Sequence, residues 1–538
     1  MKQRFLALLL AISLLLSGCG MVDFEGYFGA LGSAMTGETA VVPFESMTYA
    51  RPDVAEVERT YDALCQAVQG EDEEAVIDAI YTFYDAYDWF YTCYSLANIH
   101  YCADMTDIYW EKEYGYCVEN SPQVDALLED MNYVLAKSPC REELENEEYF
   151  GAGYFDSYEG ENLWDDAFSA MLTREAELTG QYNDFYEASL TMEPGSQEYY
   201  DAWADEMAQV LVELIKVRQE MAAYLGYEDY TQFANAFYYY RDYAPEDVER
   251  YLQDIREELV EIYTEVFHSD AWDEAYEFCS EEENFAFLKQ IAKNMGGTIW
   301  EAFRLMEDGN LYDISYGENK YPVSFEVYLT SYYEPYIFLN PSLMQYDKLA
   351  FAHEFGHFCN EYACYGSYAG VDVLEFYSLG MEYLAICYGE DTESLMKLKM
   401  ADSLSLFVEQ AAFASFEQQM YGLTGEALSV EGLYSLYEEV ALSYGFDAVG
   451  YDRREFVDIT HFFTNPMYII SYVVSNDAAM QLYQLEQAEP GKGLGLMEEI
   501  LDSQESWFLA FLEEAGLESP FAPGRIEQVK TTFEAVFG

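Results

Sequence analysis

The sequence predicts a mainly α-helical protein with one small β-sheet placed directly before its most distinctive helix. Apolar residues recur at three- and four-residue steps over most of the chain, as in the stripe Val248, Leu252 and Ile255 within 245–266. A single window, 321–341, is instead rich in aromatic and β-branched residues and is bounded by Asn, Pro and Gly. Of the 538 residues, 51% are apolar, which is enough to bury a large core.

The N-terminus reads as a signal segment. Lys2 and Arg4 precede an apolar run at 5–16, which is too short to span a bilayer as a mature helix but is typical of a signal peptide. The following "LSGC" resembles a bacterial lipoprotein signal, in which Cys19 is lipidated after cleavage. An ordinary secretory signal with an incidental cysteine is the alternative.

This interpretation predicts a signal peptide at 1–18 and a tether at 19–47. The mature protein would be extracytoplasmic and held to the bacterial cell membrane by lipid on Cys19. An N-terminal helical lobe is expected at 48–195 and a catalytic region at 196–538.

Helical stripes are expected along both regions. Pro245, followed by two acidic residues, suits the start of the helix that carries the stripe described above. The other expected helices are 54–100, 122–136, 200–225, 385–420 and 473–487.

The chain is strongly acidic. It has 25 Lys plus Arg against 101 Asp plus Glu, giving a net charge of -76. Such a field repels phosphates, so nucleic acid is excluded as a partner, and cationic or neutral ligands are favoured. The plainer interpretation is a charged surface that keeps the protein soluble. Nine cysteines follow Cys19 without any CxxC spacing, so neither a cysteine zinc site nor a thioredoxin-type motif is predicted.

The segment "AHEFGHF" places two of the five histidines four residues apart. On a helix, His353 and His357 share one face and can present two imidazoles to a single zinc ion. Glu354 points about 100° around the axis, where it can reach a zinc-bound water as a general base. About 0.01 such matches are expected by chance in this composition, so the motif is specific.

A catalytic zinc needs a third protein ligand and an open position for water. Glu375 and Glu382 follow seven residues apart, on one face of a second expected helix. Glu375 comes soon after Gly366 and Gly370, which let the chain turn back, so it is the favoured ligand. Glu382 would then hold a zinc-bound imidazole without touching the metal itself, and the reverse assignment stays open.

The stretch "PYIFLNPSLMQYDKLAFAHEFGH" resembles the core of the oligoendopeptidase F and thimet oligopeptidase family of zinc metallopeptidases. Segments 214–255 and 460–479 are similar to helical regions on either side of it. The resemblance implies one Zn²⁺ per chain, with Glu375 as the ligand that begins a glutamate pair. The loop between His357 and Glu375 is several residues shorter than is usual in the family.

The same resemblance implies further site residues and a fold. His461 and Tyr472 would donate hydrogen bonds to the substrate carbonyl and the oxyanion, with Tyr468 as a second candidate. The implied fold is a two-lobed helical zincin with a deep substrate channel, acting as a monomer on oligopeptides. The strand near 335–340 is expected to pair with the substrate backbone.

The function predicted from the sequence is therefore a zinc-dependent endopeptidase of oligopeptides, with Glu354 as general base. Two alternatives stay open. One is a non-catalytic peptide-binding lipoprotein that retains the same site residues. The other is a zinc carboxypeptidase with the same histidine motif.

Overall fold

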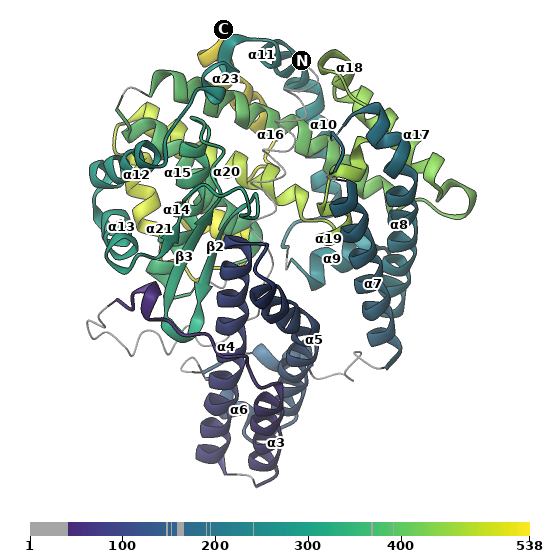
Figure 1. Cartoon of the computed structure of the whole chain (residues 1–538), viewed down its shortest axis with the longest axis vertical. Coiled ribbons are helices and arrows are strands. Elements are labelled where there is room, and N and C mark those ends of the chain that lie inside the picture. Colours follow the sequence, from purple (N-terminus) through teal and green to yellow (C-terminus); the bar gives the residue numbers. More distant parts are fainter. Residues whose placement is uncertain are drawn as a thin grey trace.

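The computed structural model describes residues 41–538, apart from 71, 147–148, 152, 159–165, 190, 194, 240, 367–368 and 391. The predicted signal peptide, Cys19 and most of the tether lie outside the described residues. The prediction of a mainly helical fold with one small sheet beside the histidine-motif helix is confirmed (Figure 1).

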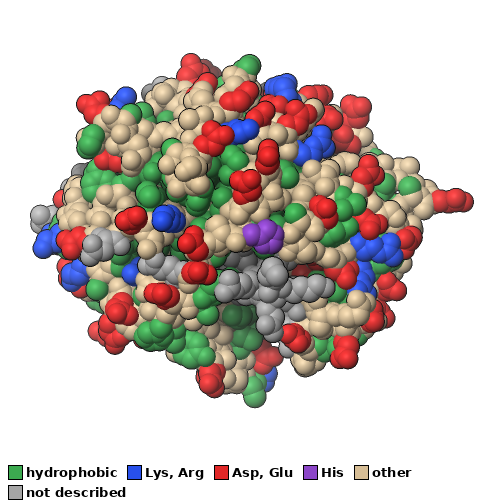
Figure 2. Space-filling view, turned by 90° about the horizontal axis from the view of Figure 1, so that it is seen from above, with side chains coloured by type: hydrophobic (Ala, Val, Ile, Leu, Met, Phe, Trp, Pro, Cys, Tyr) green, Lys and Arg blue, Asp and Glu red, His purple; other side chains and the backbone are tan. Residues whose placement is uncertain are grey.

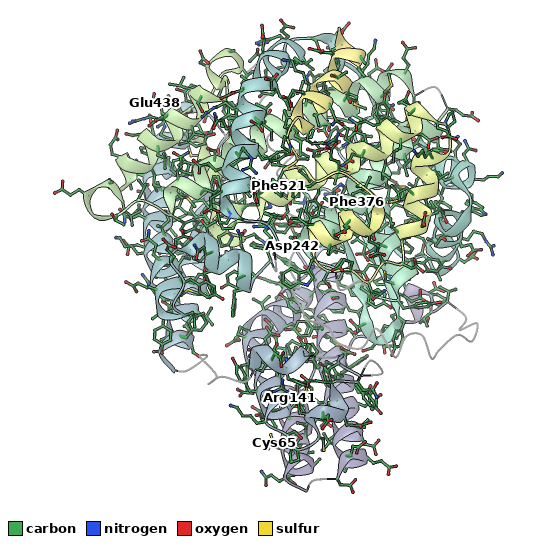
Figure 3. All side chains as sticks on the ribbon, turned by 180° about the vertical axis from the view of Figure 1, so that it is seen from behind. Cys65, Arg141, Asp242, Phe376, Glu438 and Phe521 are labelled. Carbon is green, nitrogen blue, oxygen red and sulfur yellow. The ribbon has the colours of Figure 1, made fainter. Side chains whose placement is uncertain are left out.

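The N-terminal helices form a unit with a core of their own. It contains α3 (Val54–Gly70), α4 (Glu73–Ala103), α5 (Ile108–Ala136), α6 (Arg141–Leu144) and η2 (Tyr154–Tyr158). The expected helix 54–100 is two helices, since α3 ends at Gly70 and α4 begins at Glu73. The unit projects from the rest of the molecule, with Cys65 and Arg141 far from Phe376 of the larger part (Figure 3).

The larger core begins earlier in the chain than the predicted lobe boundary. Phe168, Leu178 and Tyr182 of α7 (Asp166–Ser189) are buried with the residues of α8 (Gln197–Tyr224), not with the N-terminal unit. The other helices of this part are α9 (Tyr230–Phe237), α10 (Pro245–Glu258), α11 (Val260–Phe267), α12 (Glu281–Met295), α13 (Gly297–Gly309), α14 (Asp347–Cys364), α15 (Val371–Tyr388), α16 (Glu393–Met420), α17 (Val430–Ser443), α18 (Phe446–Val449), α19 (His461–Thr464), α20 (Ile469–Ala488), α21 (Lys492–Ile500), α22 (Phe508–Ala515) and α23 (Arg525–Phe537).

The sheet has three strands in the order β1 (Tyr312–Asp313), β3 (Glu334–Leu339), β2 (Ser324–Leu329). Strand β3 pairs with β1 in parallel and with β2 antiparallel. Because β3 lies between two strands, the expectation that it receives a substrate strand is wrong. The edges of the described sheet are β1 and β2, and β2 is the longer of the two.

The end of the predicted tether packs against this sheet. The Val42 N–H donates to Glu334 Oε1 at 2.9 Å, and the Phe44 ring lies 4.3 Å from that of Tyr336. Residues 41–47 therefore belong to the folded body.

Helix α14, which carries the histidine motif, is held between the sheet and α15. Gly356 makes the close packing of α14 on α15 possible, since a Cβ there would lie 2.4 Å from the Tyr377 carbonyl oxygen. The helix ends at Cys364, and Tyr365 and Gly366 both take positive φ angles (55° and 99°) that turn the chain back toward α15. This reversal places α15 beside the two histidines.

Acidic side chains greatly outnumber basic ones on the surface seen from above (Figure 2). Within residues 41–538, the described helices include none with the length and hydrophobicity that crossing a membrane needs.

One buried carboxyl in the core gives a stability prediction. Glu409 of α16 is fully buried and accepts a hydrogen bond from the Tyr263 hydroxyl at 2.8 Å, whereas its Oε2 has no partner among the described residues. Burial raises the pKa of Glu409 to about 8, from an ordinary 4.5. The folded state therefore binds this proton more tightly, and its stability falls as pH rises from about 4.5 through 8.

Glu409→Gln should raise the free energy of unfolding at pH 8.5 by up to about 4 kcal/mol, with little gain at pH 5. Urea unfolding of both proteins at the two pH values measures this. An equal effect at both pH values would contradict the assignment.

Candidate metal centre and active site

The three side chains predicted to bind zinc lie together. His353, His357 and Glu375 each offer one ligand atom, and these atoms all lie within 4.8 Å of one another. All three residues are buried, with Glu375 fully inaccessible. Two imidazoles and one carboxylate fit a catalytic zinc, which keeps its fourth position open.

Glu382 approaches His353 from the opposite side. The His353 Nδ1 lies 2.8 Å from Glu382 Oε1, while its Nε2 lies 3.6 Å from Glu375 Oε2. Nδ1 therefore carries the proton donated to Glu382, and the ring is turned so that Nε2 faces the metal cluster. Burial alone would lower the pKa of His353, but the bond to Glu382 and the charges of Glu375 and Glu382 raise it to about 9.

Glu354 is fully buried beside this cluster. Neither of its carboxylate oxygens has a hydrogen-bond partner in the described part of the chain. The Ser324 hydroxyl of β2 approaches it without forming a well-aligned hydrogen bond. Burial raises the pKa of Glu354 to about 7. A carboxyl with free oxygens and this pKa can both take and release a proton near neutrality.

The predicted oxyanion donors come from α19 and α20. The Tyr472 hydroxyl lies 3.3 Å from His461 Nε2, and the Tyr468 hydroxyl donates to Glu375 Oε1 at 2.9 Å. The two tyrosines thus differ, since Tyr468 holds the carboxylate of the metal cluster and Tyr472 pairs with His461. Met467, just before them, has a positive φ of 69°, and its N–H donates to buried Glu417 at 2.7 Å. That strained residue aims Tyr468 at the cluster.

Several neighbours of the site were missed by the sequence reasoning. Burial and the charges of Glu361 and Glu354 raise the pKa of Glu326, on β2, well above its ordinary range. Lys399 of α16 lies behind Glu382. Neither position has a motif around it. The packing of β2 on α14 brings Glu326 to the site, and the packing of α16 on α15 brings Lys399.

Arg218 of α8 was also missed, and it anchors the segment that carries His461. It is 1% exposed and donates to the carbonyl oxygens of Phe462 and Phe463 at 2.7 and 2.6 Å. A third bond, at 2.6 Å, joins it to Glu175. The planar guanidinium fork spans acceptors that a lysine cannot reach together.

Arg218→Lys should lower peptide hydrolysis about 10–100-fold through misplacement of His461, with bound zinc unchanged. The free energy of unfolding should fall by about 1–3 kcal/mol because a buried carbonyl loses its donor. Arg525→Lys is the matched control, since Arg525 is equally buried but pairs with Asp477. Turnover and urea unfolding test both, and equal turnover losses in the two variants would contradict the anchoring role.

Comparisons with known proteins bear on the family and the fold. Residues 44–162 match the family model "Peptidase M3 N-terminal domain". A structure of oligoendopeptidase F matches with a TM-score of 0.77 at 19% identity, covering 92% of this chain and 98% of its own. The chain has the oligoendopeptidase F fold. An oligoendopeptidase F from Bacillus anthracis gives a TM-score of 0.75 at 20% identity, over 92% of this chain and 98% of that one.

Two further structures share the oligoendopeptidase F fold to different degrees. Pz peptidase A, solved with an inhibitor, matches with a TM-score of 0.77 at 19% identity, over 91% and 98% of the two chains. An M32 carboxypeptidase from Deinococcus radiodurans gives a TM-score of 0.59 at 12% identity, over 90% and 100%. No curated protein shows a significant similarity to this sequence. The resemblance predicted from the sequence is confirmed, and it supports a peptidase.

Proposed function

We propose that this chain is a zinc-dependent endopeptidase that hydrolyses oligopeptides. The observation that carries the proposal is that the ligand atoms of His353, His357 and Glu375 lie within 4.8 Å of one another. Beside them is Glu354, whose carboxylate has no hydrogen-bond partner among the described residues. Zinc bound to these three ligands would activate a water molecule and polarise the scissile carbonyl.

The chain's own residues divide the remaining work. Glu354 takes a proton from the attacking water and later gives it to the leaving amine. His461 and Tyr472 supply hydrogen bonds to the developing oxyanion, a role worth about 2–4 kcal/mol for each donor. Tyr468 and Glu382 hold Glu375 and His353 in their metal-facing orientations.

Strand β2 gives the substrate a place to bind. It is the longer of the two edge strands of the described sheet, and its Ser324 lies next to Glu354. A peptide added to this edge as a further strand would bring its backbone past the general base. The deep channel implied by the resemblance would restrict substrates to oligopeptides, and the net charge of -76 favours cationic ones.

Digestion of peptides with both ends blocked tests the proposal. An N-acetylated, C-amidated peptide mixture should be cut at internal bonds, as identified by mass spectrometry of the products. Chelation should stop the reaction and added zinc should restore it. Cleavage confined to the last residue of peptides with a free C-terminus would overturn the endopeptidase assignment.

That last outcome defines the second candidate, a zinc carboxypeptidase. The fold shared with the M32 carboxypeptidase favours it over other metal hydrolases. The histidine motif and the general base would serve either reaction.

We also propose that the mature protein is lipid-anchored at Cys19 on the outer face of a bacterial membrane. The "LSGC" sequence after an apolar run supports this. Labelled fatty acid should be incorporated into the wild type and not into Cys19→Ser; equal labelling would contradict it.

A further inference from the structure

A buried lysine lies directly behind the metal cluster. Lys399 of α16 is completely inaccessible, and its Nζ lies 2.8 Å from Glu382 Oε2. The other oxygen of the same carboxylate, Oε1, faces His353 Nδ1 at 2.8 Å. Glu382 thus bridges a buried cation and a side chain of the metal cluster, with one oxygen for each.

The surroundings of Lys399 fix its position. Its Nζ lies over the Tyr383 ring, 4.7 Å from the centroid, and 3.9 Å from Asp402 Oδ2. Asp402 in turn accepts a hydrogen bond from the Tyr346 hydroxyl, at the start of α14, at 2.8 Å. The network therefore ties together α14, α15 and α16, the helices that carry His353, Glu382 and Lys399.

We propose that Lys399 is a positioning residue for the metal site, acting on zinc affinity through Glu382 and His353. This inference rests on the proposed zinc function. A carboxylate oxygen that faces a buried cation cannot turn away, so the second oxygen stays fixed on Nδ1. The ring is thereby oriented with Nε2 toward Glu375, the orientation that a metal requires.

A simple charge argument predicts the opposite sign. A lysine near a divalent cation repels it, so its removal should tighten zinc binding if direct electrostatics dominate. Positioning through Glu382 predicts weaker binding. The direction of the change therefore separates the two effects, and a merely structural lysine would alter unfolding without altering the affinity of the folded protein.

The experiment measures zinc dissociation constants of the full mature chain by competition with a chromophoric chelator at pH 7.5. Lys399→Met, close in shape and uncharged, should weaken zinc binding about 10–100-fold, the range found when outer-shell partners are removed. Lys320→Met is the matched control. Lys320 is also buried and pairs with a carboxylate, Asp313 at 3.0 Å, but lies by the sheet, so its zinc affinity should match the wild type.

A second background keeps the test decisive if Lys399→Met does not fold. In Glu382→Ala, both oxygens of the carboxylate that links Lys399 to His353 are gone, so adding Lys399→Met should not weaken zinc binding further. Wild-type or tighter affinity in Lys399→Met would overturn the inference, as would a further weakening when Lys399→Met is added to Glu382→Ala. A wild type that binds no zinc would overturn the proposed function itself, and this inference with it.

Discussion

Glu354→Gln is expected to abolish most peptide hydrolysis while leaving zinc bound. Glu354 lies outside the metal cluster, and both of its carboxylate oxygens are unpartnered in the described structure. An amide of the same shape cannot accept the water's proton, so turnover should fall by about 10²–10⁴-fold. Hydrolysis of a blocked peptide and the zinc content of both proteins measure the two halves of this prediction.

The matched control for this change is Glu282→Gln, an exposed glutamate of α12. It should keep wild-type turnover. Full hydrolysis by Glu354→Gln would remove the general base from the mechanism. Unchanged function in the cell despite lost hydrolysis would favour the non-catalytic peptide-binding protein.

Glu375→Gln is expected to cause a larger loss of zinc affinity than Glu382→Gln. Glu375 is fully buried and shares one point with His353 and His357. Glu382 reaches only the far nitrogen of His353, so Glu382→Gln should weaken binding by the smaller outer-shell amount, about 10–100-fold. Chelator competition on both variants ranks the two glutamates.

If Glu382→Gln lost more zinc affinity than Glu375→Gln, Glu382 would be the metal ligand and Glu375 the supporting residue. Urea unfolding of the metal-free proteins is the control, because a general loss of folding would lower both affinities together.

The helices and the histidine motif could be predicted because their signals are local. The period of apolar residues places α8 and α20 to within a few residues, whereas the stripe expected as one helix over 245–266 is divided at Leu259 into α10 and α11. A four-residue spacing puts His353 and His357 on one face. Glu375 could be predicted to join the two histidines because only a turn separates the two adjacent helices, and Gly366 supplies that turn.

The rest of the site depends on contacts that no local pattern records. Lys399 and Arg218 reach the site from α16 and α8 through tertiary packing, and each stands in an ordinary helical stripe in the sequence. The prediction that the strand near 335–340 pairs with the substrate failed for a similar reason. Two adjacent strands were visible, but the short β1 that makes β3 an interior strand contains only Tyr312 and Asp313.

Anomalous X-ray scattering at the zinc edge, from crystals of the zinc-loaded protein, tests the central claim most directly. A single strong peak is expected about 2.0–2.2 Å from an imidazole nitrogen of both His353 and His357 and from the Glu375 carboxylate. No peak within bonding distance of these three residues would contradict the assignment of this cluster as the metal centre.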